Sequence, residues 1–96
     1  MIIHLIPVFS KQLLTVKKSG DTLTVNDQVL DFSPVPDGAT LPKEAIGCEH
    51  IVDDVHRIDG VLLIKILFPH SVDASEAARF PEPIIDPADG ILELPQ

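Results

Sequence analysis

Paired turn residues at intervals along the chain are the feature that most limits how it can fold. Ser19-Gly20, Asn26-Asp27, Asp59-Gly60 and Asp89-Gly90 each lie between short apolar stretches rich in Val, Ile and Leu. Such pairs tolerate the positive φ angles of tight hairpin turns, and β-branched residues favour strand backbone. No long segment repeats its apolar residues with the period of a helix. The pattern therefore predicts a small, mainly antiparallel β domain.

Two hairpin units can be located. Apolar residues alternate with Thr and Lys over residues 14–17 and again over 22–25, and a third apolar run covers 29–32. Three such runs joined by two short turns are typical of a meander. A second unit is expected from strands at 48–58 and 61–68 around Asp59-Gly60. The latter run is apolar on both faces apart from one lysine, which favours a central strand covered on both sides.

Helical signals are few. Residues 73–80 combine a capping-box spacing between Asp73 and Glu76 with three alanines, and Pro81 ends the run. A single helical turn can also form between Pro42 and Gly47. With 96 residues the chain is too short for two independent cores. We expect one compact domain over residues 1–96: an antiparallel meander or sandwich, or a small barrel, with one short helix near residues 73–80.

Charge and composition exclude several partners. Fifteen acidic residues against seven basic ones give a net charge of −8, which would repel a phosphate backbone. The longest strongly apolar run is far shorter than the roughly 20 residues of a membrane helix, and the apolar start lacks the basic region of a signal peptide. Cys48 is the only cysteine, which suits a reducing compartment. We expect a soluble protein, cytoplasmic or virion-associated, with neither nucleic acid nor membrane as partner.

The segment around His50 is the best candidate for a metal-binding or catalytic site. In a regular strand, His50, Asp54 and His56 would share one face, and two histidines with a carboxylate can bind a first-row metal. However, a straight strand would separate the two histidines by about 20 Å. Asp54 and His56 also resemble the orienting acid and base of a hydrolytic triad, but no serine or cysteine has the context of a nucleophile. We therefore expect no enzyme activity, no cofactor and a solvated strand face, with a metal-binding or small-molecule-binding β domain as the alternative.

Two segments are candidates for protein contacts because they combine apolar side chains with backbone outside regular hairpins. They are the 34–46 loop and the 80–85 tail. The residues expected to make these contacts are Val35, Leu41, Ile46, Phe80, Ile84 and Ile85.

Several short stretches of the sequence resemble stretches in small hypothetical proteins encoded in phage and prophage tail regions. They are the stretch from Asp31 to Pro42, the opening Met1-Ile-Ile-His-Leu, and the closing Phe80-Pro-Glu-Pro-Ile and Asp86-Pro-Ala-Asp-Gly. These stretches consist of turns and prolines and carry no catalytic signature. The resemblance implies a non-enzymatic structural or accessory protein of tail assembly. Such a protein would act through contacts with phage structural proteins or as a homo-oligomer.

Overall fold

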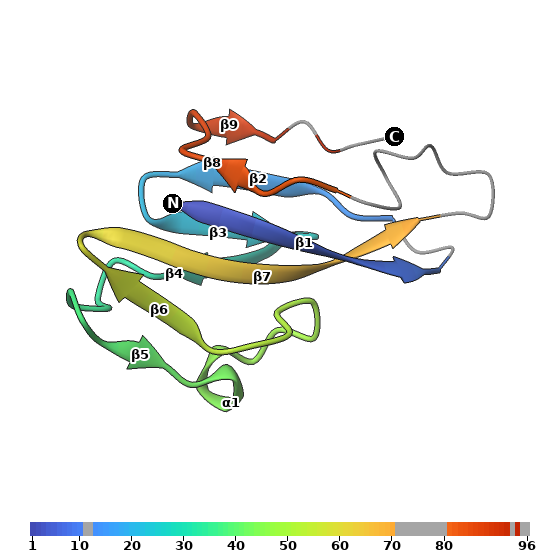
Figure 1. The fold of residues 1–96 in the computed structure, drawn as a ribbon. Coiled ribbons are helices and arrows are strands. Elements are labelled where there is room, and N and C mark those ends of the chain that lie inside the picture. The colour runs from blue at the N-terminus through green and yellow to red at the C-terminus, as the bar shows by residue number, and fades with distance from the viewer. Residues whose placement is uncertain (11–12, 71–80, 93, 95–96) are drawn as a thin grey trace.

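Two β-sheets stacked face to face form the body of the protein (Figure 1). The computed structural model describes residues 1–10, 13–70, 81–92 and 94. One sheet has five strands in the order β5-β6-β7-β1-β8, and the other has four in the order β4-β3-β2-β9. The strands are β1 (Ile2–Phe9), β2 (Val16–Ser19), β3 (Thr22–Val25), β4 (Gln28–Asp31), β5 (Thr40–Leu41), β6 (Val55–Ile58), β7 (Val61–His70), β8 (Ile84–Ile85) and β9 (Gly90–Ile91).

The core lies between the two sheets and explains their alternating sequences. In β7 and in the first half of β1 every second side chain is buried between the sheets, where it meets the buried residues of β2, β3 and β4. These buried residues belong to one contiguous cluster, which includes Ile3, Leu5, Val16, Leu23, Val25, Leu30, Ile64 and Ile66. The predicted mainly β class is thus confirmed, in its sandwich form.

The predicted meander is confirmed as β2, β3 and β4. Asn26 and Asp27 both have positive φ, 46° and 70°, and join β3 to β4 through a two-residue turn. Asp59 and Gly60, with φ of 51° and 79°, join β6 to β7 in the same way. In both places the sequence pair supplies the left-handed backbone that a tight hairpin needs.

The five-stranded sheet is mixed, whereas the sequence predicted a mainly antiparallel fold. β1 pairs with β7 in parallel along its whole length, from Ile2 opposite Leu63 to Phe9 opposite His70. β8 pairs antiparallel with the first residues of β1, and the N-terminal ammonium contacts Asp86 at 3.3 Å. Parallel strands are joined by a long connection, so the sequence contains no short turn from which the pairing of β1 with β7 could be predicted.

The predicted strand at 48–58 is wrong for its first seven residues. Only Val55–Ile58 form β6, and the preceding segment touches β7 through an isolated bridge between Ile51 and Ile66. The observed helix is the short α1 (Lys43–Ile46), which begins after Pro42 and ends at Gly47 with φ of 70°. The helix predicted at 73–80 lies outside the described residues. No helix in the described ranges is long and apolar enough to cross a membrane.

Candidate protein-interaction site

A groove of about 370 Å³ opens beside β5, at the first of the two predicted contact segments. Its wall comes from the end of β4, the loop that follows, β5 and α1. The residues that line the groove are Asp31, Pro34, Val35, Pro36, Ala39, Thr40, Leu41 and Ala45. Most of these side chains are apolar, and one carboxylate stands among them. We call this feature the β5 groove.

Two tight turns give the loop its shape. The Val35 N–H donates to the Phe32 carbonyl at 3.1 Å, and the Ala39 N–H donates to the Pro36 carbonyl at 3.0 Å. Prolines 34 and 36 fix φ within these turns and lower the entropy lost when the loop orders. Backbone hydrogen bonds within the loop therefore order the wall of the groove without a bound partner.

Arg57 on β6 anchors this loop to both sheets. Its backbone carbonyl accepts the Gly38 N–H at 2.7 Å, and its backbone N–H donates to the Ala39 carbonyl at 3.1 Å. Its Nη2 donates to the Asp21 carboxylate and to the Phe32 carbonyl, both at 3.1 Å. Because Asp21 and Phe32 flank strands of the other sheet, one side chain ties β6 to the opposite layer.

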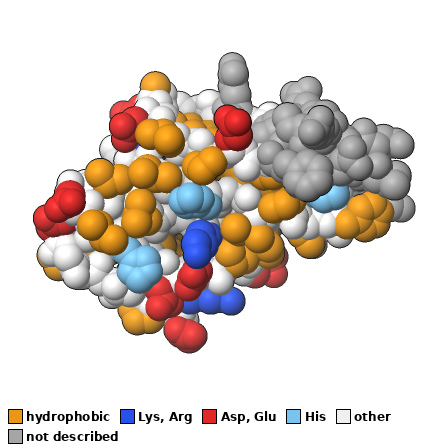
Figure 2. Space-filling model, viewed as in Figure 1, with side chains coloured by type: hydrophobic (Ala, Val, Ile, Leu, Met, Phe, Trp, Pro, Cys, Tyr) orange, Lys and Arg blue, Asp and Glu red, His pale blue; other side chains and the backbone are white. Residues whose placement is uncertain are grey.

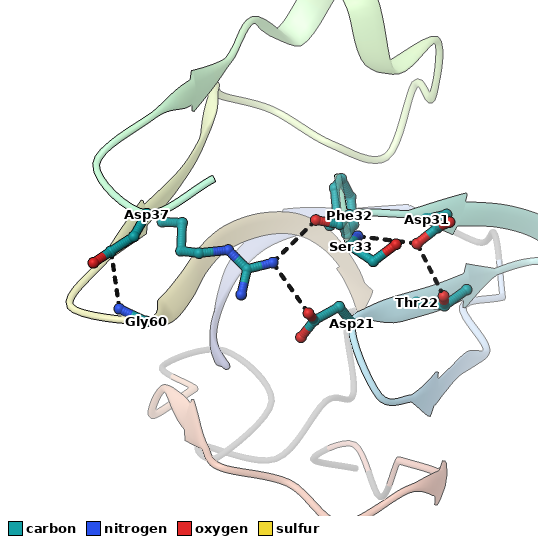
Figure 3. A network of polar contacts seen from close by, with 8 residues as sticks. Asp21, Thr22, Asp31, Phe32, Ser33, Asp37 and Gly60 are labelled. Atoms are coloured by element: carbon teal, nitrogen blue, oxygen red, sulfur yellow. Dashed lines mark hydrogen bonds and ion pairs between the residues drawn. The ribbon is translucent and has the colours of Figure 1, made fainter. Parts of the chain in front are cut away.

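Asp31 gives the groove its charge. Its carboxylate accepts the Ser33 N–H at 2.9 Å and the Thr22 hydroxyl at 3.3 Å, as drawn in Figure 3. The hydrogen bonds from Ser33, its backbone N–H first, lower the pKa of Asp31 below the ordinary aspartate value. The group is therefore an anion at neutral pH, and the groove offers an apolar lining next to a negative charge.

The residues predicted to make contacts have different environments. Leu41 lines the groove and is partly exposed, whereas Val35 is only 7% exposed and belongs to the core. Ile46 and Ile84 are partly buried against the same core, while Ile85 on β8 is 66% exposed. Phe80 lies outside the described residues.

The three predicted metal-ligand candidates have separate partners. His50 Nε2 lies 3.3 Å from the Asn26 amide nitrogen, and the Asp54 carboxylate accepts the Lys43 N–H at 2.8 Å. His56 Nδ1 lies 2.8 Å from the Thr40 hydroxyl. Because residues 48–54 are not a strand, the alternation that put the three on one face does not apply. In the part of the chain that the structure describes, no three His, Cys, Asp or Glu side chains are grouped so as to hold a metal ion.

Of the residues that line the groove, only Asp31 lies outside the predicted 34–46 segment; Ala39 and Ala45 lie within it but were not named individually. Asp31 ends β4, and Ala45 lies on α1, fourteen positions later in the chain. Only the folding of the loop back toward β4 brings them to one cavity, and neither alanine has a distinctive sequence context. The sequence feature that predicted a contact at this loop was the combination of apolar side chains with backbone outside the regular hairpins.

Comparison of the chain with family models, with curated proteins and with solved structures gave no match in any of the three searches.

Proposed function

We propose that this protein is a non-enzymatic structural or accessory protein of phage or prophage tail assembly, which binds another protein through the β5 groove. The observation that carries the proposal is the groove itself, an apolar cavity of about 370 Å³ at a contact segment predicted from sequence. The tail setting is supported by the resemblance of the Asp31–Pro42 stretch to small proteins of tail regions.

The groove favours a particular kind of segment. Leu41 and the two prolines offer apolar surface to a side chain such as Leu or Val, and Asp31 offers a carboxylate to a neighbouring Lys or Arg. The net charge of −8 adds attraction at longer range for a basic partner. We therefore propose a partner segment that carries an apolar residue next to a basic one.

The loop is suited to binding because it is already ordered. Its backbone hydrogen bonds and its attachment to Arg57 mean that little further ordering is needed when a partner binds. Preorganised surfaces lose less side-chain and loop entropy on association. A groove of this size holds one or two side chains, so the rest of the contact would extend over neighbouring exposed surface.

The test is a binding measurement between this protein and the purified products of the genes that flank its own. Leu41→Lys places a long, charged side chain in the groove and should weaken binding by about tenfold or more. Ile91→Lys is the matched control, because Ile91 is 71% exposed on β9, at the opposite edge of the four-stranded sheet from β4, and does not line the groove. Absence of any binding partner among those products, or equal loss from both variants, would refute the proposal.

A further inference from the structure

β4 is an edge strand without the features that usually protect a sheet edge. It is the outermost strand of the four-stranded sheet and has four residues, whereas β5, β8 and β9, the other edge strands among the described residues, have two each. Natural proteins protect an edge by keeping it short or by placing a proline, a lysine or a bulge in it. The sequence of β4 contains neither proline nor lysine, and its pairing with β3 is regular.

The backbone groups of Val29 and Asp31 point away from β3. The Phe32 N–H donates to the Asp21 carbonyl at 3.0 Å, so the backbone of Phe32 points toward β3. Because backbone groups alternate in direction along an antiparallel strand, those of Leu30 also point toward β3, and those of Val29 and Asp31 point outward. Among the residues that the structure describes, none forms a hydrogen bond with these outward groups. The edge of β4 therefore offers unpaired N–H donors and carbonyl acceptors.

The β5 groove lies beside this edge. Asp31 lines the groove together with Leu41 of β5, which belongs to the other sheet, and Ala45 of α1. At the other end of β4, Gln28 Nε2 donates to the Gly47 carbonyl at 3.0 Å, so the end of α1 also lies next to β4. An extended segment paired with β4 would therefore run along the groove.

The two sides of such a segment would meet different surroundings. The Asp31 carboxylate lies on the solvent side of its sheet with Thr22, whose hydroxyl donates to it, while Leu30 is 6% exposed and points into the core. Successive side chains of a strand point to opposite faces. One residue of the segment would face the apolar lining near Leu41, and the next would lie on the side of the Asp31 carboxylate. The surroundings thus favour alternating apolar and basic residues.

Charge favours a basic segment over a second copy of β4. Residues 27–47, which include β4, the wall of the groove and α1, carry four carboxylates and one lysine. Figure 2 shows one group of acidic side chains at the lower end of the molecule, where α1 lies. Pairing β4 with β4 of a second copy would bring Asp27 and Asp31 of both chains to one edge, and like charges on neighbouring strands are destabilising. A basic segment is attracted there instead.

We propose that the partner segment binds as an added β-strand, which pairs with the backbone of Val29 and Asp31 and alternates apolar and basic residues. This inference rests on the proposed function and specifies how the partner is bound. In strand addition, main-chain hydrogen bonds supply the affinity and alternate side chains supply the specificity. For a short peptide we expect a dissociation constant on the order of 10–1,000 µM.

Fluorescence anisotropy with a labelled peptide that alternates Lys and Val tests the proposal before the partner is known. The peptide should bind, because it combines basic and apolar side chains with free backbone donors. A peptide that alternates Glu and Val should bind at least about tenfold more weakly, because its carboxylates are repelled. A Lys–Val peptide that is N-methylated at every residue keeps the side chains but lacks backbone donors, and it should also lose at least about tenfold.

Val29→Pro tests the edge of the protein itself. Proline removes the outward N–H of Val29 and leaves the hydrogen bonds between β4 and β3 in place, which is the position where edge strands tolerate proline. It should weaken binding of the Lys–Val peptide at least about tenfold. Ile91→Pro is the matched control on β9, the opposite edge. The Leu92 N–H donates to the Val16 carbonyl at 2.8 Å, so the Ile91 N–H also points away from its sheet.

Amide hydrogen exchange of the unmodified protein, followed by nuclear magnetic resonance, provides a second measurement in case Val29→Pro does not fold. The Lys–Val peptide should slow exchange of the Val29 and Asp31 N–H groups at least about tenfold at saturation and leave that of Ile91 unchanged. Exchange rates that the peptide leaves unchanged at Val29 and Asp31 would overturn the proposal.

Three binding results would also overturn it. They are equal affinity for the N-methylated peptide, equal affinity for the Glu–Val peptide, and equal effects of Val29→Pro and Ile91→Pro. The proposed function fails separately. If a flanking gene product binds and Leu41→Lys weakens it but Val29→Pro does not, the groove is a binding site and strand addition is wrong. If the peptide results are as expected and no flanking product binds, strand addition is supported and the tail-assembly role is refuted.

Discussion

Replacing Arg57 by methionine tests how the two sheets are held together beneath the β5 groove. Methionine keeps an unbranched stem of similar reach but removes the guanidinium. Two contacts are lost, the ion pair with Asp21 and the hydrogen bond to the Phe32 carbonyl, both 3.1 Å long. The Phe32 carbonyl keeps its second donor, the Val35 N–H. The variant therefore breaks the link between the layers without leaving that carbonyl unpaired.

The expected change in the free energy of unfolding is the balance of two losses and one gain. A hydrogen bond from a charged donor contributes about 1.5–3 kcal/mol, and an ion pair whose carboxylate side chain is 42% exposed contributes about 0.2–1 kcal/mol. Against these, the buried Nε of Arg57 has no hydrogen-bond partner, so its removal returns about 1 kcal/mol or more of desolvation cost. The net expectation is a loss of about 1–2 kcal/mol. For a domain of this length that lowers Tm by about 5–15 °C.

Thermal unfolding followed by far-ultraviolet circular dichroism measures this change, since the chain has no Trp or Tyr for fluorescence. Lys17→Met is the matched control, because it removes one positive charge from an exposed position on β2 and should shift Tm by no more than about 2 °C. If Arg57→Met is as stable as the unmodified protein, or more stable, the contacts of Arg57 with Asp21 and Phe32 do not stabilise the fold.

Three other changes test the packing, the turn chemistry and the charged hydrogen bonds. Ile66→Ala should cost about 2–5 kcal/mol in urea unfolding, since Ile66 is fully buried; a cost below about 1 kcal/mol would contradict its core position. Asn26→Ala should cost about 1–3 kcal/mol, because its side chain binds two backbone groups at positive φ, and Asn26→Gly should cost less; the reverse order would refute the turn argument. Hydrogen bonds lower the pKa of three aspartates, Asp31, Asp53 and Asp89. Their stabilisation should be present above the ordinary aspartate pKa of about 3.9 and should be lost as pH falls through the lowered values, so urea unfolding that is insensitive to pH below about 4 would contradict it.

The local elements were predictable because single residues determine them. Asn26-Asp27 and Asp59-Gly60 adopt the positive φ angles that their residue types tolerate, and each joins two antiparallel strands. Gly47 ends the short helix at positive φ for the same reason. In these places the chemistry of one or two residues decides the structure within a few positions.

The parallel β1–β7 pair and the β5 groove were not predictable because each depends on contacts between distant segments. Ile3 and Ile64 are paired across sixty-one positions, and no local pattern specifies parallel over antiparallel pairing. His50 was misplaced for a related reason, since the segment 48–54 turns instead of continuing β6. Apolar runs in β1 and β7 indicated burial, but the sequence alone could not say which face the second sheet would cover.

The measurement that most directly tests the central claim is site-specific photo-crosslinking in the cells that produce this protein. A photoreactive side chain at Leu41 lies in the β5 groove, and one at Thr24 on the meander serves as the control. We predict that the Leu41 probe captures one discrete protein, identified by mass spectrometry, that Asp31→Lys abolishes the capture, and that the Thr24 probe captures none. Capture of no protein from the groove, or the same products from both positions, would contradict this prediction.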